Sequence, residues 1–432
     1  MTEHFSKKII SFFSFFILIF SNVHSLSLSD FSSKLTDIFD WSTDENEGTT
    51  SFRSLLIPFG GRSESLGSAF TGLSDDISFL QFNPAGSALQ KQTQLSVFHN
   101  AWIADSKLDT IAYTTRFKNL GLGTYFSCFY VPFSEYNNWG DKVSSSYYSE
   151  SVFALNVAYN FLAGYDFKGI TVGASFKTAW RGMPDYTDKN SDEIISSSGI
   201  SQSSLAFMAD FGAMLQFNFL KFFASRDPNV RIGIAAQNLG AGFTGFSKKI
   251  EADDGLPSSF SVGISIKPLK YLTFSADFKL PVNFFYATLL KPYIGFGASV
   301  QFTDFLAVLA GFEIKGGNPK ISAGFEFEIS KIRMNFNYSL DLTTSYSPVN
   351  KISLCAKMIL GDRGRSDFDS KVDELYKAGL VYYTEGKWEE AIETWNECLK
   401  LNRRFDPARK GIASAESIIY TIQTAEEFKK LN

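Results

Sequence analysis

Side chains that commonly carry catalysis or bind metal ions are scarce in this chain. Its 432 residues include three histidines and three cysteines. The cysteines, Cys128, Cys355 and Cys398, lie too far apart for a zinc site or a disulfide framework. The adjacent acids Asp75 and Asp76 fit a turn better than catalysis, because no nucleophile with a neighbouring base accompanies them. We therefore expect a protein that is not an enzyme and that uses no cofactor and no metal.

Charged side chains instead recur at alternate positions within apolar segments, where they share a face with small polar residues. The basic residues of interest are Lys177, Arg231, Lys279 and Arg333. They form either part of a mixed-charge wall that holds water and ion pairs, or contacts for an acidic head group such as a fatty-acid carboxylate. The net charge of -4 gives no electrostatic footprint for nucleic acid, so we expect no such partner.

The segments that position these side chains alternate between apolar and polar residues. In residues 272–280 and 321–329 every second residue is apolar, which is the pattern of a strand with two different environments. Fourteen candidate strands begin near Thr93, Leu108, Leu120, Ser151, Lys168, Ser203, Val230, Ser259, Tyr271, Lys291, Phe305, Pro319, Lys331 and Val349. Each strand with its connection has about 19 residues, which suits a tilted membrane-spanning strand of about 9–11 residues.

Such strands fit either a soluble two-sheet sandwich, for example a lectin-like or adhesin domain, or a transmembrane barrel. The strands are even in number and nearly uniform in length, which favours the barrel. Many begin or end on aromatic residues, as membrane-interface girdles do, at Trp102, Tyr130, Trp180, Tyr271 and Tyr338. Short connections alternate with long polar ones, which we expect at residues 134–148 and 183–201.

Residues 1–25 have the pattern of a secretory signal peptide. Two lysines precede an apolar run at residues 9–20, and Ser25 offers a small residue at the cleavage point. An uncleaved anchor is the alternative, but twelve helical residues reach only about 18 Å, short of a bilayer core of about 30 Å. Export beyond the inner membrane also favours the barrel. Residues 26–52 are expected to form an acidic linker.

A motif before the first candidate strand resembles a known family. Within residues 58–86, PFGGRSESLGSAFTGLSDDISFLQFNPAG, the matching positions are Gly67, Ala69, Phe70, Gly72, Asp75, Asp76, Ser78, Asn83, Pro84, Ala85 and Gly86. The run resembles the N-terminal hatch of FadL-type outer-membrane transporters and of the related PorV-like barrel proteins, including uncharacterised spirochaete members. The resemblance implies an all-β barrel of about fourteen antiparallel strands, plugged from within. It also implies that hydrophobic small molecules cross by hatch rearrangement and a lateral opening.

The expected hatch covers residues 53–92 and the expected barrel covers residues 93–360. Small residues in the hatch would allow close contact with the wall of a lumen wide enough to leak. Asn83 is held extended by the following ring, and its amide is able to cap backbone groups. The residues expected to gate the lumen are Asn83, Pro84, Ala85, Gly86, Phe79 and Phe82. The two phenylalanines either line a greasy pocket or simply pack the plug.

Residues 366–432 change to helical periodicity and resemble a tetratricopeptide repeat. Apolar, small and aromatic residues match that motif at Leu375, Gly379, Tyr382, Gly386, Ala391, Trp395 and Cys398. Arg403 stands where the motif has proline. One repeat cannot bury its own apolar face, so we expect docking on a third helix, on the barrel or on a periplasmic protein. The expected partner-binding residues are Trp388, Trp395 and Tyr383.

Two functions from different classes follow. The first is a passive bacterial outer-membrane transporter for hydrophobic small molecules such as long-chain fatty acids, gated by the hatch. The second is a PorV-like scaffold that engages periplasmic or secreted partners through the helical tail. In both cases the barrel contacts outer-membrane lipid. An even number of strands returns both ends of the wall to one side, which places the helical module in the periplasm.

Overall fold

The computed structural model describes residues 49–431, apart from 104, 138, 186–194, 246–249, 253–254, 316–317 and 343–348. The expected signal peptide and most of the expected linker lie outside the described residues. Within the described part of the chain, no helix is long and apolar enough to cross a membrane.

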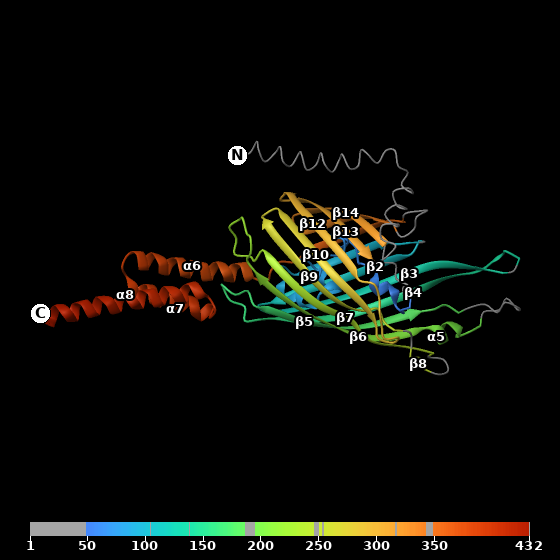
Figure 1. Ribbon diagram of the computed structural model, residues 1–432, viewed down its shortest axis with the longest axis horizontal. Coiled ribbons are helices and arrows are strands. Elements are labelled where there is room, and N and C mark those ends of the chain that lie inside the picture. Colours follow the sequence, from blue (N-terminus) through green and yellow to red (C-terminus); the bar gives the residue numbers. More distant parts are fainter. Residues whose placement is uncertain are drawn as a thin grey trace.

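In the described residues, fourteen antiparallel strands form the wall of a closed barrel, which confirms the predicted fold class. Figure 1 shows the arrangement of these strands. Strands adjacent in the chain pair around the wall, and β1 pairs with β16 to close it. The wall strands are β1 (Gln94–Ala101), β2 (Lys107–Phe117), β3 (Leu120–Tyr136), β4 (Lys142–Phe161), β5 (Ile170–Gly182), β6 (Ser204–Phe217), β7 (Val230–Thr244), β9 (Ser258–Leu269), β10 (Leu272–Asn283), β12 (Tyr293–Thr303), β13 (Leu306–Lys315), β14 (Asn318–Ile329), β15 (Ile332–Asp341) and β16 (Val349–Ile359). Two short strands, β8 (Glu251–Ala252) and β11 (Thr288–Leu289), only extend hairpins at the rim.

The two faces of the wall follow the period-two pattern of the sequence. In β5, Phe176 and Trp180 point outward and are 52% and 40% exposed, whereas Ser175 and Lys177 point inward and are 3% and 2% exposed. An apolar outer face and a polar inner face are the arrangement of a barrel in lipid. The alternation therefore reports two environments, lipid and lumen.

The two ends of the barrel differ. At one end, which we call the turn end, strands such as β2 and β3 or β14 and β15 are joined by tight turns. At the other, the loop end, the longer connections join β5 to β6 and β7 to β9. Exposed aromatic residues gather at the turn end (Phe117, Phe161, Phe302 and Phe305) and at the loop end (Trp180, Phe284 and Tyr286). These two groups correspond to membrane-interface girdles.

The stretch 134–148, expected to be a loop, is mostly a strand hairpin. β3 continues to Tyr136, and β4 begins at Lys142 rather than near Ser151. Figure 1 shows these two strands projecting beyond the rest of the wall. Because water reaches both faces of the projecting part, its residues are polar on both faces and the period-two signal is lost.

The hatch runs through the barrel from the loop end to the turn end, and Figure 1 shows it in blue inside the wall. At the loop end, the N–H of Ser51 donates to the carbonyl of Gly255. Four short helices follow: η3 (Arg53–Leu56), α3 (Arg62–Ser65), α4 (Phe79–Phe82) and η4 (Pro84–Leu89). At the turn end, the N–H of Thr93 donates to the carbonyl of Gly361. The ordered hatch thus includes Ser51, which lies in the expected linker.

Inward-facing glycines let the hatch backbone touch the wall. A Cβ added at Gly311 of β13 would lie 2.0 Å from the nitrogen of Gly67, and one added at Gly121 of β3 would lie 2.2 Å from the nitrogen of Ala88. Side-chain carbons do not approach backbone atoms so closely, so these wall positions require glycine. The small residues that allow close contact therefore lie on the wall as well as on the hatch.

Three helices project from the turn end (Figure 1): α6 (Arg365–Thr384), α7 (Trp388–Leu401) and α8 (Asp406–Leu431). α6 and α7 pack as a hairpin, and α8 packs on α7. Trp395 lies at the centre of this module, with its ring against Gly379 of α6 and Gly411 of α8. The third helix therefore covers the apolar face that the single repeat leaves open.

The helical module is also attached to the barrel. The rings of Tyr165, in the turn between β4 and β5, and Phe405 meet edge to face with centroids 5.0 Å apart. Arg226, in the connection between β6 and β7, pairs with Asp373 of α6 at 2.5 Å. The guanidinium of Arg365 donates to backbone carbonyls at the end of the hatch. Barrel, hatch and module are thus joined at the turn end.

Candidate functional site

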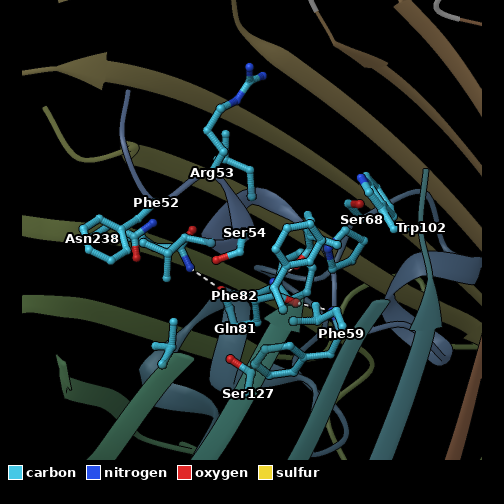
Figure 2. Close-up of a pocket in the computed structure, with 18 of the residues that line it drawn as sticks. Phe52, Arg53, Ser54, Phe59, Ser68, Gln81, Phe82, Trp102, Ser127 and Asn238 are labelled. Carbon is cyan, nitrogen blue, oxygen red and sulfur yellow. Dashed lines mark hydrogen bonds between the residues drawn. The ribbon is translucent and has the colours of Figure 1, made fainter. Parts of the chain in front are cut away.

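A cavity of about 520 Å³ lies between the hatch and the loop-end half of the wall. Figure 2 shows Phe52, Phe59 and Phe82 of the hatch around this space, together with Trp102 from the connection between β1 and β2. Its volume is typical of sites that bind small molecules. Hatch and wall contribute to the same cavity, so the position of the hatch determines its shape.

Aromatic rings form an apolar side of the cavity. Phe59 meets Tyr125 of β3 edge to face with centroids 4.9 Å apart, and its ring centroid lies 5.7 Å from that of Phe98 in β1. The guanidinium of Arg181 lies 5.6 Å from the ring centroid of Phe52. This side of the cavity offers contact to an apolar or aromatic ligand.

Paired charges from the wall form the remaining side. Lys177 and Asp210 lie 2.5 Å apart and are both nearly inaccessible to solvent. Lys351 and Asp341 also lie 2.5 Å apart. Glu150 accepts a hydrogen bond from a backbone N–H of the hatch at 3.0 Å. Because these charges have partners, the wall remains polar without leaving isolated buried charges.

The wall carries an irregularity beside the cavity. The ladder between β7 and β9 ends at the pair Gln237 and Ser259. Asn238 follows with a positive φ of 56°. Its side chain donates to the carbonyl of Pro257 at 3.0 Å and accepts from Lys177 at 2.9 Å. Side-chain hydrogen bonds thus replace the backbone ladder at this point.

Ion pairs hold the hatch to one side of the wall. Arg62 donates to both carboxylate oxygens of Asp75, at 3.1 and 2.9 Å, and lies 3.5 Å from Glu326 of β14. Asp76 pairs with Lys357 of β16, and both side chains are 1% exposed. A moving hatch would have to exchange or break these buried pairs.

Asn83 fixes the local turn into η4. Its side-chain oxygen accepts from the N–H of Ala85 at 3.1 Å, and its amide group donates to the carbonyl of Thr71 at 3.1 Å. The following proline occupies the first position of η4, where its missing N–H costs nothing. The NPAG motif therefore folds as a capped helical turn.

The structure brings some of the expected site residues together and separates others. Of the residues expected to gate the lumen, only Phe82 lines the cavity. The others are buried outside the cavity: Asn83, Pro84, Ala85, Gly86 and Phe79. Lys177 and Lys279 line the cavity. Arg231 donates to the carbonyl of Leu73 at 2.7 Å, and Arg333 pairs with Glu328 at 2.6 Å, so neither faces the cavity. Trp395 is 1% exposed, while Trp388 and Tyr383 are partly buried beside it.

The sequence does not predict the place of four cavity residues, namely Phe52, Phe59, Tyr125 and Trp102. Phe52 falls in the expected linker, and Trp102 lines the cavity instead of belonging to the expected membrane-interface girdle. Tyr125 has a usable signal, because it is an aromatic residue between the small residues Gly123 and Ser127 on the inward register of β3. The described residues hold no group of three or more His, Cys, Asp or Glu side chains placed to bind a metal ion.

Fourteen antiparallel strands with an apolar outer face, closed around an internal N-terminal segment, define a β-barrel fold of the outer-membrane type. Residues 29–363 match the model of UPF0164, an uncharacterised protein family, and the chain belongs to that family. Two UPF0164 proteins of Treponema pallidum (strain Nichols) are similar along most of their length. One is 28% identical over 400 residues, covering 90% of this chain and 88% of the relative; the other is 29% identical over 414 residues, covering 90% and 80%.

Solved structures of similar fold are more distant in sequence. A deltaS2 mutant of the TodX monoaromatic hydrocarbon channel has 11% identity and a TM-score of 0.43, covering 70% of this chain and 98% of that one. The toluene transporter TodX of Pseudomonas putida has 12% identity and a TM-score of 0.40, covering 68% and 96%. The KdgM porin has 7% identity and a TM-score of 0.30, covering 61% and 98%.

Proposed function

We propose that this protein is a passive outer-membrane transporter for hydrophobic small molecules such as long-chain fatty acids, gated by its hatch. The cavity carries the proposal, because aromatic rings of the hatch and of the wall enclose it together. A movement of the hatch would change both the pocket and the path beyond it. We place the turn end and the helical module in the periplasm, since outer-membrane barrels carry their short turns on that side.

Two routes out of the cavity fit the proposal. One follows the lumen past the hatch. The other leads sideways at the end of the β7 and β9 ladder, where side-chain hydrogen bonds of Asn238 replace the backbone pairing. Lys177 and Lys279 line the cavity and are proposed contacts for an acidic head group. Arg231 and Arg333 hold a hatch carbonyl and a wall carboxylate instead.

Uptake of a fluorescently labelled long-chain fatty acid tests this function. The full chain would be produced in a host that lacks its own carrier, with Phe59→Ser as the cavity variant. Phe211→Ser, on the outer face of β6, is the matched control. We expect uptake above that of the empty host, reduced about tenfold by Phe59→Ser and little changed by the control. No uptake by a folded wild-type barrel would contradict the proposal.

A scaffold that engages periplasmic or secreted partners is the second candidate. The observation that favours it is the length of α8, which has 26 residues against the 14 of α7. Beyond the hairpin, Tyr420 and Phe428 are 71% and 64% exposed. Removal of residues 364–432 separates the two functions. Loss of periplasmic cross-links with unchanged uptake assigns partner binding to the module, whereas unchanged cross-links exclude this role.

A further inference from the structure

In the described wall strands, acidic and basic side chains occur at one place on the outer face. Among the outward-facing positions of the described wall strands, Asp, Glu, Lys, Arg and His occur only as His99, Lys107 and Asp109. The side chains of His99 and Asp109 are 43% and 46% exposed, so they do point away from the lumen. An ionisable residue facing lipid is costly and indicates a specific role.

The three residues belong to a polar patch that spans four neighbouring strands. His99 Nδ1 and Asp109 Oδ1 lie 2.6 Å apart, and the hydroxyl of Tyr130 donates to Asp109 Oδ2 at 3.2 Å. The cross-strand register extends the patch from Asp109 to Cys128 and Ser151 in one row, and from Lys107 to Tyr130 and Ser149 in the next. The row closer to the turn end is entirely apolar and consists of Val97, Ile111, Phe126 and Phe153. The polar patch therefore ends sharply on the side that faces the turn end.

The position of the patch along the barrel axis places it at the edge of the membrane. Asp109 and Lys107 lie eight and ten residues along β2 from Phe117, a girdle residue of the turn end. At about 3.3 Å per residue and a tilt of about 40°, these separations correspond to about 20 and 25 Å along the barrel axis. The apolar band of such barrels is about 25 Å tall. The patch thus meets the head groups of the leaflet at the loop end.

We propose that this patch binds the phosphate-bearing head group of a membrane lipid. Lys107 supplies the cation, since the described residues give its ammonium group no ion pair or hydrogen bond. Asp109 repels a phosphate only weakly, because both of its carboxylate oxygens are engaged in contacts with His99 and Tyr130. The hydroxyl groups of Ser149 and Ser151 lie in register with Tyr130 and Cys128, close enough to donate to phosphate or glycerol oxygens. Ser151 would do so in place of its weak hydrogen bond to Cys128 Sγ at 3.6 Å. The site lies outside the lumen and is independent of the transport path.

Native mass spectrometry of the purified full chain tests the proposal. Phosphatidylglycerol and diacylglycerol, which lacks the phosphate, would be titrated separately onto the detergent-solubilised protein. We expect one phosphatidylglycerol to be retained about tenfold better than diacylglycerol. Lys107→Ala should remove this preference and Lys107→Arg should keep it. Lys331→Ala, which removes a lysine from a turn at the other end, is the control and should change nothing.

Other results would overturn the proposal. Equal retention of the two lipids shows that the phosphate is not recognised, and equal retention by the wild type and Lys107→Ala shows that the patch is not the site. Dimers that dissociate on Lys107→Ala, without lipid retention, would assign the patch to a contact between copies of the chain. Heat-modifiable gel migration verifies that each variant is folded. Ser151→Ala gives a second, milder variant with an expected partial loss of the preference.

Discussion

Lys357 and Asp76 carry opposite charges deep inside the barrel, shielded from water. Lys357 also donates to the amide oxygen of Asn335 at 3.0 Å. The partners are 281 residues apart in the chain. The sequence places Asp76 in the expected hatch, but nothing in the pattern indicates that it meets Lys357. At the residue scale, the attachment of the hatch depends on such long-range pairs.

Removing one member of this pair should be more damaging than removing both. Lys357→Met leaves Asp76 buried without its partner, and we expect the free energy of unfolding to fall by about 3–5 kcal/mol. Adding Asp76→Asn should restore part of this loss, because the uncompensated charge is then gone. The loss of heat-modifiable migration with increasing urea measures the effect. Equal stability of the single and double variants would show that the pair does not act as a unit.

A second prediction concerns the contact between Gly311 and the hatch. The Cβ of Gly311→Ala would overlap the backbone of Gly67, so the hatch must shift away from β13. We expect raised ion conductance in planar bilayers while the barrel stays folded. Gly182→Ala at the loop end is the control, because its Cβ would meet only side-chain atoms. Conductance that rises equally in both variants would argue against a tight seal at Gly311.

The sequence predicts strands correctly where each face of the strand meets a single environment, either lipid or the lumen. The fourteen strands and the helical tail follow from periodicity, whereas the hatch follows from its resemblance to a family motif. The hairpin at 134–148 was missed because water surrounds it. The cavity was predicted only in part, since Phe59, Tyr125 and Lys177 come from separate elements whose register no local pattern fixes. Lipid-facing strands are therefore more predictable than the contacts inside the lumen.

Helix α6 begins with a local capping arrangement outside the membrane. Asp362 accepts hydrogen bonds from the hydroxyl and N–H of Ser366 and from the N–H of Gly364. These bonds to its charged form lower the pKa of Asp362 to about 2. Because the pKa is depressed, the stabilisation is complete above the ordinary value of 3.8 and is lost as the pH falls towards 2. The start of the module is thus insensitive to pH near neutrality.

The docking of the module on the barrel should depend on an aromatic contact more than on charge. Phe405 is 4% exposed and contacts Tyr165, so Phe405→Ala should lower the stability of the module by about 3 kcal/mol. Arg226→Ala removes an exposed ion pair with Asp373 and should cost no more than about 1 kcal/mol. Hydrogen exchange of α6 to α8 in the full chain measures both. A larger effect of Arg226→Ala would reverse this ranking.

On the scale of the whole molecule, the hatch is a segment that fills the lumen of a wide barrel. A barrel of fourteen strands encloses a lumen that leaks unless something fills it. Deleting residues 58–90 should leave a folded barrel with raised ion conductance in planar bilayers. Deleting residues 364–432 should leave the conductance at the wild-type level, because the module lies outside the lumen. Unchanged conductance after the hatch deletion would contradict its role as a plug.

The path of the hatch from one end of the barrel to the other constrains biogenesis. The hatch must already lie inside the barrel when β1 pairs with β16. The reason is that the N–H of Gly61 donates to the hydroxyl of Ser353, which lies 292 residues further along the chain. Contacts so distant in sequence form late and slowly. Closure of the β1 and β16 seam is then the step that traps the hatch. A barrel that closes too early would be left empty, with a correct wall and an open pore.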